Sequence, residues 1–260
     1  PNAKFSTLIQ HVPEAIAHGA EVLSDCMATQ IEVGDDGLVR GVVFVHDGVE
    51  HRQKAKVVIL SNFVVETPRL LLQCTSKRFP DGLANSSGMV GKCIMPHSSH
   101  DMYALFDEEI RLYKGTPVLA TTQDFYETDP SRGFVRGYTL HAHGARPLEF
   151  AGGLCKAGIW GKELREAMYD YNYYGRVTLV GEVLPDEKNA VTLADETDEY
   201  GLKRAVVTFS YGPNDSALIR HAVETGNRIL EAAGGKPRYV VPDTAHLSGG
   251  CRMGNDPSTS

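Results

Sequence analysis

Short runs in which apolar and polar residues alternate occur along much of the chain, and they predict antiparallel strands. Residues 27–56 hold two such runs, Met27–Val33 and Leu38–Val45, with the turn sequences Asp35-Asp36-Gly37 and Asp47-Gly48 between or after them. We therefore predict a β-meander over residues 27–56. The apolar run Val57–Leu60 follows the meander, and its lack of alternation is typical of a strand that is buried on both faces.

Further alternating runs occupy the middle of the chain, among them Val118–Thr122, Phe134–His143 and Val177–Leu184. Turn sequences join them, whereas a parallel sheet would need crossover helices, so an antiparallel sheet is favoured. Two helices are predicted, one from about residue 162 to 173 and one from a cap at Asn214 or Asp215 to Gly234-Gly235. The fold class that follows is α+β, an antiparallel sheet with helices on one face.

Composition and charge narrow the class of partner. The 260 residues carry a net charge of −7, whereas a nucleic-acid surface is normally basic, so we expect no nucleic-acid partner. No apolar run approaches the length that crosses a bilayer, so we predict no transmembrane segment. The 42% hydrophobic content supports a substantial core in one large domain or two moderate ones.

The segment HLSGGCRMGNDP, residues 246–257, combines a titratable imidazole with three glycines. The imidazole of His246 can exchange a proton near neutral pH. Glycines such as Gly249 and Gly250 allow unusual dihedral angles and a close approach of the backbone to a ligand. From these residues alone, His246 is a candidate catalyst or an ordinary loop histidine.

The segment after Val57–Leu60 is predicted to form a helix that begins at Thr67-Pro68. Threonine can cap a helix, and proline at the first helical position sacrifices no N–H group that the helix needs. A strand, a turn and a capped helix can present backbone N–H groups to an anion or a cofactor. The alternative is an ordinary joint between a strand and a helix.

His141 and His143 lie two residues apart in a predicted strand, and therefore on the same face of it. Together with His97 and His100 they raise the question of a metal site. No carboxylate pattern or third ligand stands at a characteristic spacing, so no metal ligands are predicted and a position on the surface of the sheet is favoured.

Three stretches resemble the glucose-methanol-choline (GMC) family of flavoprotein oxidoreductases. Residues 246–257 are similar to the family's C-terminal active-site motif. The stretch VVILSNFVVETPRLLL, residues 57–72, resembles the second signature of the family. The stretch NSSGMVGK, residues 85–92, with His97 close behind, resembles the segment that follows that signature. The three stretches occur in the family's order.

This resemblance implies a domain organisation and roles for individual residues. Residues 1–93 correspond to a partial FAD-binding domain (a β-meander with strand and helix pieces), residues 94–235 to a substrate-binding domain, and residues 236–260 to a return segment of the FAD-binding domain. His246 matches the family's active-site histidine, a general base. His141 and His143 fall in the sheet that forms one wall of the substrate cavity. The resemblance places the following residues beside FAD: Asn62, Glu66, Thr67, Pro68, Gly249 and Gly250.

The resemblance also implies a reaction, the oxidation of a CH–OH group of a sugar, polyol or other alcohol by hydride transfer to FAD. The sequences of residues 66–69 and 251–254 resemble those of bacterial members, including the large subunits of gluconate-type dehydrogenases. Those enzymes pass electrons to a cytochrome or a quinone, so a dehydrogenase is favoured over an oxidase. Bacterial cytoplasm and periplasm both stay open as compartments.

The alternative is a non-catalytic, β-rich module that binds a ligand or a partner. No Gly-x-Gly-x-x-Gly follows any predicted strand, although this turn cradles the pyrophosphate of a dinucleotide. The chain also reads as a piece of a longer protein. We therefore expect this chain alone to be inactive and not to retain FAD.

Overall fold

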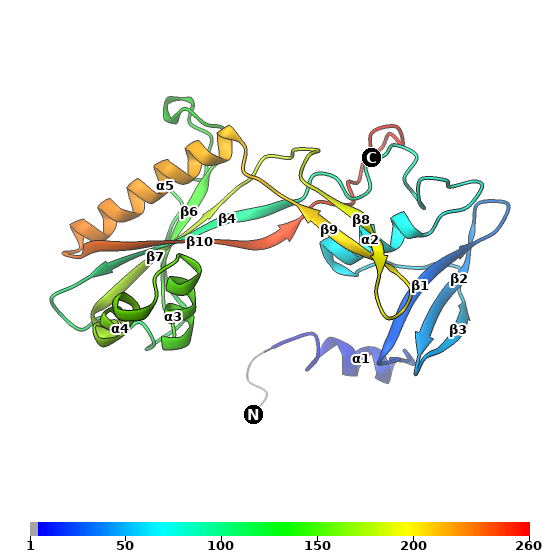
Figure 1. Cartoon of the computed structure of the whole chain (residues 1–260), viewed down its shortest axis with the longest axis horizontal. Coiled ribbons are helices and arrows are strands. Elements are labelled where there is room, and N and C mark those ends of the chain that lie inside the picture. The colour runs from blue at the N-terminus through cyan, green and yellow to red at the C-terminus, as the bar shows by residue number, and fades with distance from the viewer. Residues whose placement is uncertain (1–4) are drawn as a thin grey trace.

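The computed structural model describes residues 5–260, which form two lobes connected by two long neighbouring strands (Figure 1). The first lobe is built on a five-stranded antiparallel sheet with the order β10-β4-β7-β6-β5. The antiparallel arrangement confirms the prediction. Its strands are β4 (Met95–Leu105), β5 (Val118–Thr122), β6 (Tyr138–His143), β7 (Tyr174–Gly181) and β10 (Lys236–Ser248).

Helices cover both faces of this sheet, so the prediction that they lie on one face was wrong. Helix α5 (Pro213–Ala232) packs on one face through Leu218, Ala222 and Leu230. Helices α3 (Pro147–Lys156) and α4 (Gly161–Tyr169) pack on the other face through Phe150, Leu154 and Ala167. The reason lies in β4, where the consecutive residues Met102 and Tyr103 are both buried. Because successive strand residues point to opposite faces, each face presents an apolar surface.

The second lobe contains the predicted meander, which the structure confirms as an antiparallel sheet of β1, β2 and β3. Helix α2 (Phe63–Gln73) packs Leu70 and Leu71 against Ile31 of β1. A separate hairpin of β8 and β9 lies on the other side of α2. The remaining bounds are β1 (Cys26–Val33), β2 (Val39–His46), β3 (Val49–Lys54), β8 (Ala190–Thr197), β9 (Lys203–Thr208), α1 (His11–Ala17), and the 3₁₀ turns η1 (Pro130–Arg132) and η2 (Tyr171–Tyr173).

The predicted buried strand Val57–Leu60 is not a strand, and it is not buried. Val57 is 76% exposed and Ile59 is 84% exposed. A strand needs a neighbour for its backbone N–H and C=O groups, and within residues 5–260 no strand pairs with this segment.

Helix α2 begins four residues before the predicted start. It starts at Phe63, so Pro68 lies inside the helix and Thr67 doesn't cap it. The Thr67 hydroxyl oxygen instead accepts a hydrogen bond from the Asn62 N–H at 3.1 Å. Pro68 has no N–H to donate to the carbonyl of Val64, and the helix accommodates this single loss near its first turns.

The division into domains at residues 93 and 235 remains a prediction. By secondary structure alone, β10 belongs to the five-stranded sheet of the first lobe, because it pairs with β4 along most of its length. The β8–β9 hairpin contacts α2 of the second lobe. The chain thus passes between the lobes more than once. No helix among residues 5–260 combines the length and the apolar character that crossing a membrane requires.

Candidate active site

His246 lies in a β-bulge near the end of β10. Ala245 is opposite His97 of β4, but the next paired residue of β10 is Ser248, opposite Met95. His246 has φ +47°, a left-handed conformation that is uncommon for a residue other than glycine. The Ser248 hydroxyl donates to the Met95 carbonyl at 2.9 Å and closes the irregular segment. Bulges of this kind change the direction of a side chain.

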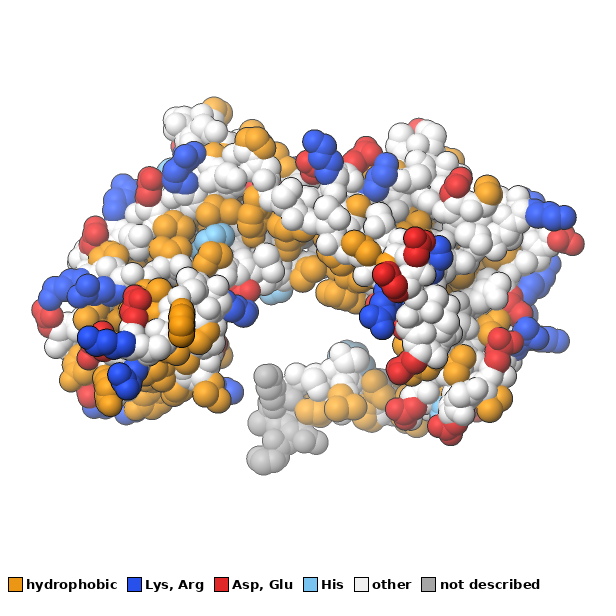
Figure 2. All heavy atoms as spheres, viewed as in Figure 1, with side chains coloured by type: hydrophobic (Ala, Val, Ile, Leu, Met, Phe, Trp, Pro, Cys, Tyr) orange, Lys and Arg blue, Asp and Glu red, His pale blue; other side chains and the backbone are white. Residues whose placement is uncertain are grey.

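The bulge brings His246 against His97. Ala245 and His97 are opposite each other and so share a face of the sheet, and a regular strand would send His246 to the other face. Instead, the two imidazole Nδ1 atoms lie 3.2 Å apart, and the rings meet edge to face with centroids 5.2 Å apart. His246 is exposed and His97 is half-buried. β10 ends between the two lobes (Figure 1), where the surface is hollowed (Figure 2).

Gly249 and Gly250, which follow shortly after His246, allow the backbone to pack closely against neighbouring segments. Both have positive φ values, +87° and +76°. A Cβ atom on Gly249 would lie 1.9 Å from the carbonyl oxygen of Cys93, and one on Gly250 would lie 2.9 Å from the carbonyl oxygen of Val64 in α2. Gly250 also exchanges backbone hydrogen bonds with the 91–92 segment, at 2.7 and 3.1 Å. The loop is therefore held between that segment and α2, while a role beside FAD stays a prediction.

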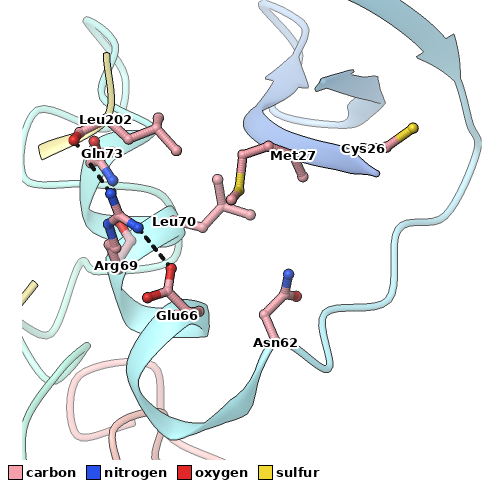
Figure 3. A pocket seen from close by; sticks show the side chains of 9 residues that line it. Cys26, Met27, Asn62, Glu66, Arg69, Leu70, Gln73 and Leu202 are labelled. Atoms are coloured by element: carbon pink, nitrogen blue, oxygen red, sulfur yellow. Dashed lines mark hydrogen bonds and ion pairs between the residues drawn. The ribbon is translucent and has the colours of Figure 1, made fainter. Parts of the chain in front are cut away.

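Asn62 and Glu66 line a pocket of about 400 Å³ between α2 and β1. Figure 3 shows both side chains on the side of α2 that faces Cys26 and Met27. Of the other two α2 residues predicted beside FAD, Thr67 is absent from this lining, and Pro68 is buried against Gly250. Of the four residues, Asn62 and Glu66 thus border the pocket, Pro68 packs inside the lobe, and Thr67 is half-buried outside the lining.

Arg69 forms the polar floor of the same pocket. Its guanidinium binds Glu66 at 3.0 Å and Asp198 at 2.6 Å. Burial by itself lowers the pKa of Arg69, but the hydrogen bonds to Asp198 and Glu66 outweigh burial and raise it. The arginine therefore stays charged and ties α2 to the β8–β9 hairpin. Both carboxylates are occupied by this pairing.

His141 and His143 lie on β6, away from His246. His141 is level with Thr178, Asp101 and Val241 across the sheet, on the same face as His97. Three strand spacings and four residue positions separate His141 from the His246 bulge, about 14 Å across the strands and about 13 Å along them. Burial, and then the neighbouring His143, lower the pKa of His141. The structure places His141 and His143 on the same sheet face as His97 but does not bring them into contact with the His97–His246 pair.

Arg176 of β7 is a buried residue that sequence reasoning missed. Its guanidinium binds Asp101 and Glu149, each at 2.9 Å, and contacts His143. It also donates to the Tyr103 hydroxyl at 3.3 Å. An arginine in an alternating strand normally indicates a solvent-facing position, so the sequence carried no signal for this network. Arg176 holds the end of β6 that carries His143.

We expect His141 and His143 to bind no metal ion. Within residues 5–260 no group of three or more His, Cys, Asp or Glu side chains has the arrangement of a metal site, and two ligands make an incomplete site. Elemental analysis after mild dialysis should find no stoichiometric transition metal. One zinc or iron ion per chain that disappears in the double variant His141→Ala/His143→Ala would contradict this prediction.

Comparison with known proteins identifies relatives of the chain. Residues 185–260 match the family described as GMC oxidoreductase. The chain is 35% identical to 2-methyl-1,2-propanediol dehydrogenase of Mycolicibacterium austroafricanum, over 100% of this chain and 50% of that protein. It is 28% identical to the fructose dehydrogenase large subunit of Gluconobacter japonicus, over 93% of this chain and 46% of that protein. These matches confirm the resemblance.

Solved structures agree at the level of the fold. The crystal structure of pyridoxine 4-oxidase from Mesorbium loti superposes with a TM-score of 0.62 at 14% identity, over 90% of this chain and 48% of that chain. The chain thus spans about half the length of the curated relatives and of the solved structure that it matches.

Proposed function

Because residues 185–260 belong by sequence to the GMC oxidoreductases, we propose that the full-length protein is an FAD-dependent enzyme that oxidises CH–OH groups of a sugar, polyol or other alcohol. The observation that carries the proposal is the position of His246. The bulge in β10 presents its imidazole between the lobes, within the matched residues. The names of the diol and fructose dehydrogenases among the relatives support the substrate class.

His246 is proposed to accept the proton of the substrate hydroxyl group. A general base must reach the proton that it removes, and an exposed imidazole at the end of β10 meets this requirement. When bound, FAD supplies the acceptor for the hydride that leaves the substrate carbon. His141 and His143 are proposed to contact the substrate from the same face of the sheet.

The residues around α2 fit one end of such a cofactor. The Asn62 side chain caps no N–H group at the start of α2 and lines the adjacent pocket. The N–H groups of a helix's first turn have no partner within the helix, so they can donate to the polar edge of a ring system. The sequence holds no Gly-x-Gly-x-x-Gly turn for the phosphates. The chain therefore provides N–H groups for the flavin-ring end of FAD, but its sequence lacks the usual glycine turn that holds the phosphates.

We expect the isolated 260-residue chain not to retain FAD, because the missing phosphate turn normally provides much of the binding. The chain is incubated with FAD and desalted, and its visible spectrum is recorded. A stoichiometric flavin band that survives desalting would contradict the prediction. Riboflavin, which lacks the pyrophosphate and the adenosine, is the matched ligand, and a gain of affinity from riboflavin to FAD would locate contacts with those groups within this chain.

The full-length enzyme is proposed to act as a dehydrogenase that passes electrons to a cytochrome or a quinone. Anaerobic mixing with a panel of diols, sugars and polyols tests the reaction, since a substrate reduces the flavin and bleaches its visible absorption. Oxygen uptake with the same substrates distinguishes a dehydrogenase from an oxidase. If none of these substrates bleaches the flavin, the proposed substrate class is wrong.

A further inference from the structure

His97 and His246 form a pair whose geometry has a chemical consequence beyond the base itself. Their Nδ1 atoms are 3.2 Å apart, within hydrogen-bonding distance. A neutral imidazole carries one N–H group and one acceptor nitrogen. When both rings are neutral, one Nδ1 therefore carries the proton and the other accepts it.

Only one of the two arrangements leaves His246 able to act as a base. If His97 donates, His246 carries its own proton on Nε2 and has no free lone pair. If His246 donates from Nδ1, its Nε2 is unprotonated and can take a proton. The hydrogen bond made by one ring nitrogen determines the protonation of the other. The hydrogen bond with His97 thus determines which ring nitrogen of His246 carries the proton.

We propose that His97 is a positioning residue: its Nδ1 accepts a hydrogen bond from His246 Nδ1–H and thereby keeps His246 Nε2 free to receive the substrate proton. The inference rests on the proposed function of His246. Once His246 has gained a proton, the same hydrogen bond has a charged donor, which strengthens it. His97 thus holds the ring before proton transfer and stabilises the cation after it.

The fold fixes His97 more firmly than His246. His97 lies within the regular part of β4, half-buried and opposite Ala245, whereas His246 is in the bulge. His97 also lines a pocket of about 390 Å³ together with Arg136 and Glu182, which form an ion pair at 3.9 Å. The regular pairing of β4 with β10 therefore fixes the position of the His97 ring, and its Nδ1 lies beside the His246 ring.

The test compares two substitutions in the full-length enzyme. His97→Ala removes the acceptor, and we expect flavin reduction to slow by about 10- to 100-fold per bound flavin, the range for a hydrogen bond to a charged group. His97→Asn keeps an acceptor oxygen and should restore the rate to within about fivefold of the original. The matched control is His11→Asn on α1, an exposed histidine remote from the pair, and it should change nothing.

Nitrogen-15 NMR of the histidine rings gives a readout that is independent of turnover. His246 should carry its proton on Nδ1 in the original protein and on Nε2 in a substantial fraction of His97→Ala molecules. A proton on Nε2 in the original protein, or an unchanged rate per bound flavin in His97→Ala, would overturn the inference. If no alcohol reduces the flavin of the original enzyme, the proposed function has failed, and the NMR result still decides how the pair is protonated.

Discussion

Replacing His246 with alanine is expected to slow flavin reduction in the full-length enzyme by about 10²- to 10⁴-fold while flavin content stays the same. The range is that of a positioned general base, because the substrate hydroxyl would then lose its proton to water. The side chain is exposed at the end of β10, so its removal leaves little buried volume unfilled. The measurement is rapid mixing with substrate without oxygen, normalised to bound flavin.

The competing interpretation, a loop histidine that only packs, gives the opposite pattern. It predicts a lower thermal midpoint or loss of flavin, with little change in the rate per bound flavin. His51→Ala on β3 serves as the control, because His51 is an exposed histidine in the meander. If the His246→Ala variant reduces its flavin within a few-fold of the original enzyme, His246 is not the base.

Gly249→Ala is expected to lower the free energy of unfolding by about 2–5 kcal/mol. A left-handed alanine costs about 1–2 kcal/mol, and overpacking a well-filled site costs a further 1–3 kcal/mol or so. The new methyl group would meet the Cys93 carbonyl oxygen at 1.9 Å, and a backbone atom cannot rotate away as a side chain can. Urea unfolding of the full-length protein, followed by circular dichroism, measures the change.

Gly152→Ala in α3 is the matched control, since it makes the same chemical change at a site with no atom within 4 Å of the new methyl group. Helical φ and ψ angles suit alanine, so this variant should be unchanged or more stable by about 0.4–1 kcal/mol. Equal stability of Gly249→Ala and the original protein would show that the 249–250 loop isn't packed as described.

The sequence predicted elements whose partners are close along the chain. The meander over residues 27–56 needs only its own turns, and the structure confirms it. The prediction that Val57–Leu60 is a buried strand was wrong, because a run of apolar residues shows apolar character but not whether another strand lies beside it. Similarly, α3 was missed, and with it the second covered face of the sheet, because a helix of ten residues with two internal glycines has a weak apolar period.

The candidate site shows the same difference between local features, which the sequence predicts, and contacts between distant segments, which it does not. The residue types in the 246–257 segment were sufficient to select His246, but nothing in them shows a bulge, which depends on where β10 pairs with β4. For the same reason His97 was noted only for its position behind residues 85–92 and as one of four histidines considered for a metal site. Its contact with His246 spans 149 residues. Arg176 was missed because its partners come from β4, α3 and the end of β6.

β10 is the outermost strand of its sheet, and an exposed strand edge invites pairing between molecules. Pro237 and Pro242 are five residues apart on β10, but their partners on β4, Ala104 and His100, are four residues apart. The difference comes from the irregularity in the pairing after Pro237. Both prolines therefore occupy equivalent places in the ladder. Proline is tolerated in a strand where its nitrogen faces away from the neighbour, so the outer edge of β10 lacks two donors that a further strand would need. This edge is thus protected against the sheet-to-sheet growth that leads to aggregation.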